Sequence, residues 1–170
     1  MMYLIADQIE NLKPYLESAG GGYAPRIIWS SMVSLAGDSP PLAATCSHRS
    51  IFGTIHWSVL WLIPGALVYA EASKRADSWI YSTTVAEQSE QSEELVHLMA
   101  WRQPTSNVDR LEVEAIELAG EQRTSWSWRL AGRIVLCNGQ ILRLPLSEKA
   151  ISGDDEDAER FITQLRQLLS

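Results

Sequence analysis

The ten residues from Thr54 to Ile63 alternate between two faces, and this alternation limits the folds open to the chain more than any other feature. One face is uniformly large and apolar: Ile55, Trp57, Val59, Trp61 and Ile63. The other is mixed: Thr54, His56, Ser58, Leu60 and Leu62. A period of two residues is typical of a β-strand, and aromatic and β-branched side chains favour strands. The stretch therefore predicts a strand that buries one aromatic face.

The residues after this strand indicate further antiparallel strands. Pro64-Gly65 predicts a turn, Ala66 to Ala72 a returning strand, and Trp79 to Thr84 another. The polar stretch from Ala86 to Glu94 predicts a loop or an exposed helical turn. Later, the alternation around Leu111 slips phase at Ile116, which predicts a β-bulge.

Asn138-Gly139 marks a second hairpin, and the phase of its two arms selects the loop length. A two-residue loop would place Ile134 opposite Arg143 and mix apolar with charged faces. A three-residue loop with Gly139 in the left-handed conformation places Ile134 opposite Leu142 instead. The second arrangement keeps each face uniform, so we predict a three-residue loop.

The end of the chain predicts a helix over residues 154–169. Its apolar side chains fall on one stripe: Ala158, Phe161, Ile162, Leu165, Leu168 and Leu169. Ser152 can cap the helix, and the acids from Asp154 to Asp157 suit the positive end of its dipole. We interpret these acids as a solvated helix start and not as a metal site.

The composition fits one globular domain with a mainly β fold. The chain has 170 residues, of which 46% are hydrophobic and 21% charged, as in ordinary globular proteins. We assign 54–170 to the β domain with its C-terminal helix. We assign 1–53 to an N-terminal extension with a short helix near Ile5 to Leu16 and loops.

Net charge and cysteine content limit the partners and the cell compartment that we expect for this chain. The net charge of -7 argues against nucleic-acid binding and stable membrane association, because both rely on clustered Lys and Arg. Cys46 and Cys137 are too few for a disulfide framework. The first residues lack a secretion signal. We therefore expect a cytoplasmic protein with reduced thiols.

The order of these elements resembles the pleckstrin-homology-like fold, particularly its small bacterial members. The resemblance rests on element order and phase over four segments: Trp57 to Glu71, Trp101 to Leu118, Trp128 to Leu146, and Ala158 to Leu169. It implies two roughly orthogonal sheets in a barrel or sandwich that the C-terminal helix caps. Phe161 or Leu165 would then fill the open end.

The same resemblance bears on lipid binding. Phosphoinositide-binding members of the family carry Lys and Arg around the first hairpin. This chain places Trp61 to Ala66 at that hairpin and has no cation until Lys74 and Arg75. This difference argues against phosphoinositide binding.

No catalytic residue, metal ligand or cofactor is predicted. His48, His56 and His97 are scattered, and no pair has helical metal-ligand spacing. We therefore favour a non-enzymatic binding or interaction module that binds a protein partner or assembles with itself. The alternative hypothesis is a small-molecule binding protein or enzyme with an aromatic-lined pocket.

Two groups of side chains are candidates for binding. Trp79 and Trp101 are nearest to predicted loops and could line a groove, although alternation alone explains most tryptophans as core. The second group is a basic stripe on the late hairpin, formed by Arg129, Arg133 and Arg143. It is either a docking patch for an acidic partner or a surface ladder neutralised by Glu112 and Glu114.

Overall fold

The structure, a computed structural model, describes residues 24–37, 39–76, 79, 95–119, 127–144, 146 and 154–170. Its first sheet has the order β1 (Ala43–Ile51), β2 (Thr54–Ile63), β3 (Ala66–Arg75) and β4 (Leu95–Pro104). Its second sheet has the order β5 (Val108–Ala119), β6 (Ser127–Leu136) and β7 (Ile141–Leu144). The remaining elements are α2 (Arg26–Ala36), the 3-10 turn η1 (Thr105–Asn107) and α4 (Asp154–Leu169).

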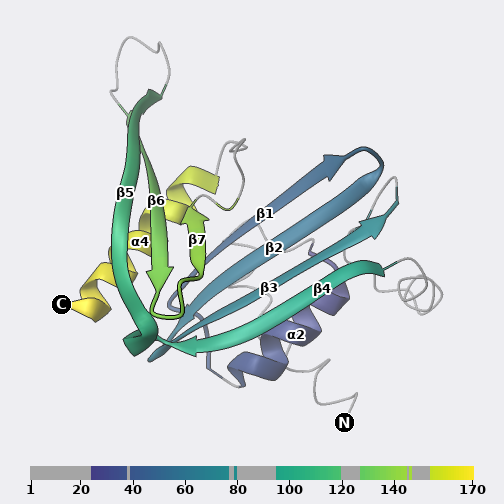
Figure 1. Ribbon diagram of the computed structural model, residues 1–170, viewed down its shortest axis with the longest axis horizontal. Helices are drawn as coiled ribbons and strands as arrows, with labels where there is room; N and C mark the ends of the chain where they lie inside the picture. The colour runs from purple at the N-terminus through teal and green to yellow at the C-terminus, as the bar shows by residue number, and fades with distance from the viewer. Residues whose placement is uncertain are drawn as a thin grey trace.

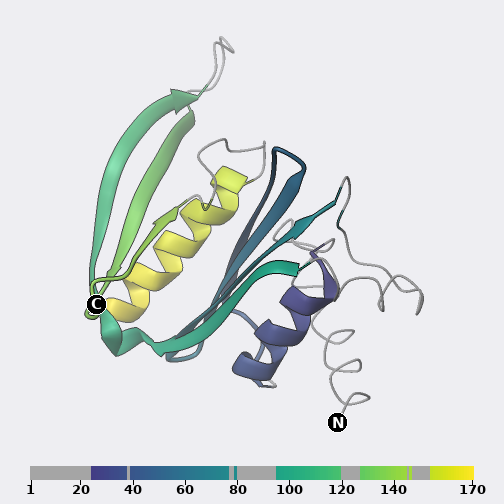
Figure 2. The ribbon, with the colours of Figure 1, turned by 45° about the vertical axis from the view of Figure 1, so that its right-hand side comes forward.

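The elements form layers around the four-stranded sheet (Figures 1 and 2). Helix α2 lies against the outer face of this sheet, where it contacts β2, β3 and β4. Helix α4 lies on the inner side, between the two sheets, where it contacts β1 and β6. The chain is thus mainly β with a C-terminal helix, as predicted, but its two sheets do not close into a barrel (Figure 2).

The outer core lies between α2 and the four-stranded sheet. Helix α2 begins after Pro25 and ends at Gly37, whose N–H donates to the Val33 carbonyl. Its buried side chains recur at helical spacing: Ile28, Trp29, Met32, Val33 and Ala36. They pack on the uniformly apolar face of β2, where the Trp29 and Trp61 ring centroids are 6.0 Å apart. The predicted aromatic face of β2 is therefore buried.

The inner core lies between the sheets and is filled by α4. From α4 come Ala158, Phe161, Ile162 and Leu165. From the two sheets come Ala43, Leu60, Leu62, Leu67, Tyr69, Ile134, Leu136, Leu142 and Leu144. Phe161 and Leu165 are both fully buried, whereas Leu168 and Leu169 at the end of the predicted stripe are exposed. The first four residues of the stripe therefore fill the space between the sheets, and the last two do not.

The late hairpin has the predicted register. Ile134 pairs with Leu142, and Gly139 has a φ of 84° in the loop that joins the strands. A bulge is present in β5, but the pairing with β6 shifts between Val113 and Ala115, earlier than the predicted slip at Ile116. Alternation and turn chemistry were sufficient to fix the register of the hairpin.

Gly132 allows α4 to approach β6 closely. A Cβ atom at this position would lie 3.0 Å from the Glu112 carbonyl oxygen and 3.3 Å from the Ile162 Cδ1 atom. The backbone oxygen cannot easily withdraw, because it belongs to the paired strand β5. A side chain at position 132 would therefore push the helix or the strand away.

The region before Thr54 differs most from its prediction. It supplies α2 and the edge strand β1, although only a short helix and loops were predicted there. The first hairpin of the sheet is therefore β1–β2, with its turn at Phe52-Gly53, and the turn at Pro64-Gly65 is the second. The expectation against phosphoinositide binding rested on the turn at Pro64-Gly65, which is not the first hairpin of this sheet.

Several predicted segments lie outside the described residues. They are the helix near Ile5 to Leu16, most of the strand from Trp79 to Thr84, the loop from Ala86 to Glu94, and the Ser152 cap. None of the helices in the described ranges is both long enough and apolar enough to cross a lipid bilayer.

The buried ring of Phe161 provides a test of the inner core. Phe161→Ala should lower the free energy of unfolding by about 3–5 kcal/mol, because it leaves a cavity between two sheets that cannot collapse freely. Thr163→Ala, on the exposed side of the same helix, should change it by less than about 0.5 kcal/mol. Chemical denaturation measures both, and a loss below about 1 kcal/mol for Phe161→Ala would show that α4 is peripheral.

Candidate functional site

The inner face of the four-stranded sheet is divided into an apolar half and a polar half. The apolar half lies under α4 and the second sheet and includes Leu60, Leu62 and Leu67. Further along the same face, toward the Phe52-Gly53 turn, the side chains become polar. We call these residues the polar half: Ser47, Arg49, His56, Ser58, Glu71, Ser73 and His97.

Strand register places the polar half in two rows across the sheet. The first row contains Ser47, Ser58 and Glu71, which are direct cross-strand partners. The second row contains Arg49, His56, Ser73 and His97, again by direct pairing. Directly opposite side chains on one face of a sheet lie within contact range, so seven polar side chains from four strands gather in one place.

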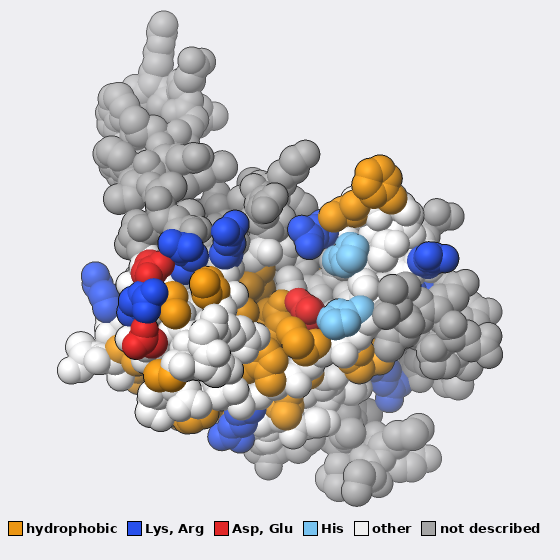
Figure 3. Space-filling model, in the orientation of Figure 1, with side chains coloured by type: hydrophobic (Ala, Val, Ile, Leu, Met, Phe, Trp, Pro, Cys, Tyr) orange, Lys and Arg blue, Asp and Glu red, His pale blue; other side chains and the backbone are white. Residues whose placement is uncertain are grey.

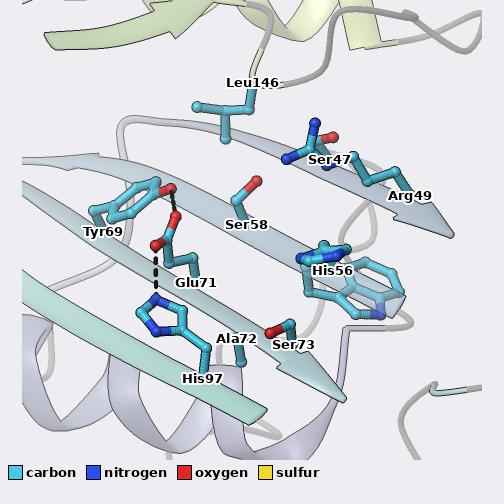
Figure 4. Close-up of a pocket in the computed structure, with 11 residues that line it drawn as sticks. Ser47, Arg49, His56, Ser58, Tyr69, Glu71, Ala72, Ser73, His97 and Leu146 are labelled. Carbon is cyan, nitrogen blue, oxygen red and sulfur yellow. Dashed lines mark hydrogen bonds and ion pairs between the residues drawn. The ribbon is translucent and has the colours of Figure 1, made fainter. Parts of the chain in front are cut away.

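These two rows form the floor of a pocket with a volume of about 190 Å³. The residues that line the pocket are Ser47, Arg49, His56, Trp57, Ser58, Tyr69, Glu71, Ala72, Ser73, His97 and Leu146. Figure 4 shows that Leu146, which follows β7, lies across the pocket from the strands. The space-filling view shows histidine and acidic side chains beside hydrophobic surface on this face (Figure 3). The volume suits a ligand of only a few heavy atoms.

Glu71 is the centre of a hydrogen-bond network on the β3–β4 side of the pocket. The Tyr69 hydroxyl donates to Glu71 Oε2 at 2.6 Å, and His97 Nε2 lies 2.8 Å from Glu71 Oε1 (Figure 4). The Tyr69 ring also stacks on Trp101, with centroids 5.3 Å apart. These contacts fix the carboxylate in one orientation and leave it further acceptor positions.

Burial raises the pKa of Tyr69 far above its ordinary value of 10.0, and the hydrogen bond to Glu71 raises it further. Ionising the phenol would place a second negative charge beside the carboxylate in a poorly solvated position. Tyr69 therefore remains a neutral donor wherever the chain is folded.

An arginine and a histidine lie on the opposite side of the pocket. Arg49 and His56 are cross-strand partners on β1 and β2. In Figure 4 the Arg49 side chain extends over β1 toward the middle of the pocket, facing the side that holds Glu71 and His97. The pocket therefore has a guanidinium on one wall and an oriented carboxylate on the other.

The next row toward the inner core contains polar atoms without partners. Thr45 and Tyr69 belong to this row, which ends at Trp101. Among the described residues, Thr45 Oγ1 and Trp101 Nε1 are buried and form no hydrogen bond. Buried polar groups without partners are rare in folded proteins, and this row also contains Leu60 and Tyr69 of the inner core. It therefore forms the boundary between the apolar half and the polar half.

The predicted tryptophans lie at different depths. Trp79 is buried in the outer core, and its carbonyl accepts a 2.8 Å hydrogen bond from Trp57 Nε1. It lies behind the sheet and does not line the pocket. Trp101 borders the inner core and supports Tyr69 from one side.

The predicted basic stripe is only partly described. Arg133 and Arg143 are direct partners across β6 and β7, and Arg143 is exposed. The Arg133 Nη2 atom lies 3.0 Å from Glu112 Oε2, and Glu112 also accepts from Arg110. The side chain of Arg129 lies outside the described part of the chain. The Glu112 contact fits a surface ladder of weak ion pairs.

Sequence reasoning missed the pocket residues, although β2 contained a signal. Its mixed face changes from polar at His56 and Ser58 to apolar at Leu60 and Leu62. A strand that is solvent-exposed on one face would be polar throughout, and a fully buried strand would be apolar throughout. The change along a single face indicates the edge of a core.

Two kinds of chemistry lack the necessary contacts. Within the described ranges, no cluster of three or more His, Cys, Asp or Glu side chains could hold a metal ion. Ser73 is the direct partner of His97, but no hydrogen bond joins these two described residues, so they do not form a nucleophile–base pair.

Comparisons with protein-family models, with curated proteins and with solved structures found no match for this chain.

The raised pKa of Tyr69 predicts a specific loss of stability at high pH. The unfolded chain ionises this phenol above about pH 10, while the folded chain does not. The contribution of the protonated phenol to the free energy of unfolding is therefore complete below about pH 10 and is lost as pH rises beyond it. The variant Tyr69→Phe has no ionisable phenol and therefore lacks this contribution. The free-energy difference between wild type and Tyr69→Phe should therefore shrink between about pH 8 and about pH 11 in chemical denaturation. A difference that stays constant would contradict the assignment.

Proposed function

We propose that this chain is a non-enzymatic binding module of pleckstrin-homology-like architecture. The order of four antiparallel strands, three antiparallel strands and a C-terminal helix between the sheets supports the architecture. Helix α2 is an addition that covers the outer face of the first sheet. An open sheet face with a bordered pocket is a suitable place for a ligand.

The ligand of this module is a small molecule with an anionic group and a positively charged or hydrogen-donating group. The observation that carries this proposal is the presence of Arg49 and Glu71 on different sides of one pocket of about 190 Å³. A guanidinium binds a carboxylate through two parallel hydrogen bonds. The Glu71 carboxylate, already oriented by Tyr69 and His97, can accept from an ammonium group.

The serines between these charges fit the same ligand class. Ser47 and Ser58 lie in the row that leads to Glu71, and each hydroxyl can donate and accept a hydrogen bond. Leu146 supplies an apolar surface from the opposite side. The site therefore fits a zwitterion of amino-acid size better than a purely apolar ligand or an extended peptide.

A panel of free α-amino acids with their matched derivatives tests this proposal. Each amino acid is compared with its N-acetyl form, which lacks the ammonium, and its amide form, which lacks the carboxylate. At a concentration of about one hundred times Kd, a bound zwitterion should stabilise the fold by about 2.7 kcal/mol. That corresponds to an increase in Tm of about 5–10 °C for a chain of this size.

Variants assign the binding to the pocket. Arg49→Gln and Glu71→Gln should each weaken binding at least about tenfold, because each removes one charge contact. Arg143→Gln, an exposed arginine on β7, should leave affinity unchanged. The proposal is wrong if no amino acid stabilises the chain, or if the amide and N-acetyl forms bind as tightly as the zwitterion.

A further inference from the structure

The turn between β1 and β2 combines backbone strain with a large exposed side chain. Phe52 and Gly53 form its two central residues and have φ values of 49° and 72°. Two-residue hairpin turns with positive φ at both positions favour Asn or Gly at the first, because a bulky side chain is strained there. Among the described residues, Phe52 is the one non-glycine residue with positive φ.

Neither the turn nor the core explains a phenylalanine at this position. Phe52 has a relative exposure of 103%, and its neighbour Ile51 is also exposed. The backbone beneath it is well supported, because Ile51 pairs with Thr54 and the Gly53 carbonyl accepts a hydrogen bond from the Ala76 N–H. The hairpin therefore presents the ring to solvent on a fixed support. Strain that the fold does not require is a reason to look for function.

The charge around the turn is the opposite of that of the whole chain. Exposed Arg75 lies near the turn, at the end of β3, and exposed Arg49, which also lines the pocket, precedes the turn on β1. Residues 49–56 and 73–76 contain no Asp or Glu, although the chain has a net charge of -7. Figure 3 shows a hydrophobic projection at the end of this hairpin with Lys or Arg surface on both sides.

We infer that this hairpin turn is a docking site for a protein partner with an apolar depression bordered by acidic side chains. Aromatic and arginine side chains are the residues that most often dominate protein interfaces. A contact between the turns of two copies of this chain would bring arginines together, and like charges in contact oppose association. One aromatic ring with two exposed arginines is also a weak membrane anchor, since stable anchoring takes a larger combination of signals.

A displayed library of small helical proteins with one randomised face supplies the probe, because a folded surface can form a depression for a phenyl ring. Binders selected on the full wild-type chain should carry Asp or Glu around an apolar centre. Phe52→Asn and Arg75→Glu should each weaken these binders at least about tenfold. The matched controls Leu98→Asn and Arg143→Glu, an exposed apolar and an exposed cationic side chain elsewhere, should leave the affinity unchanged.

Folding is monitored separately. Phe52→Asn places a preferred residue in the turn, so its Tm should equal or exceed that of the wild type. A lower Tm would contradict the strain on which the inference rests. Amino-acid binding in the pocket should be unchanged in Phe52→Asn, which separates this test from that of the proposed function.

Three results would overturn the inference. The first is that no binder is enriched, and the second is that enriched binders retain full affinity for Phe52→Asn. The third is that vesicles of phosphatidylcholine with phosphatidylserine or phosphoinositide bind the wild type and not Phe52→Asn, which would identify a membrane as the partner.

Discussion

Strand β2 is buried on both faces along half of its length, and the rest of the structure depends on this constraint. Trp61 and Ile63 require a cover on the outer face, while Leu60 and Leu62 require one on the inner face. Helix α2 covers the first face, and the second sheet with α4 covers the other. Fully burying each such side chain contributes about 1.5–3 kcal/mol, so both covers are necessary for folding.

The pocket follows from the limited extent of the inner cover. Where the apolar core ends, the same face of the sheet continues with His56, Ser58 and Glu71. The strands carry the register of the core outward, so the polar side chains are positioned by a rigid scaffold and not by loops. Tyr69 joins the two regions, because its ring packs in the inner core and its hydroxyl orients the Glu71 carboxylate. Sites held in this way lose little entropy when they bind a ligand.

Features with a local cause could be predicted from the sequence, whereas features that depend on distant pairing could not. The loop at Gly139 and the stripe of α4 follow from periodicity within a few residues. Strand β1 was missed because its side chains are buried at its start and exposed from His48 onward, so no alternation marks it. Helix α2 was missed although its buried residues recur at helical spacing, because the apolar residues from Ile27 to Leu35 were interpreted as a patch without a clear period.

The candidate site depends even more on the pairing of strands that are distant in the sequence. Arg49, His56, Glu71 and His97 come from four strands, and only the register brings them together. Neither of the two tryptophans predicted to line a groove lines this pocket, whereas Trp57 and Tyr69 do. Trp79 is buried in the outer core, and the Trp101 ring stacks on Tyr69.

The central claim is that the polar half of the inner face serves binding and not folding. The most direct measurement is the free energy of unfolding of His56→Val, in the absence and presence of a stabilising amino acid. Valine suits a strand at least as well as histidine, so the unliganded variant should be as stable as the wild type within about 0.5 kcal/mol, or more stable. Its stabilisation by the amino acid should be reduced, because His56 lines the pocket beside Arg49. A loss of more than about 2 kcal/mol without ligand, or undiminished stabilisation with it, would contradict the account.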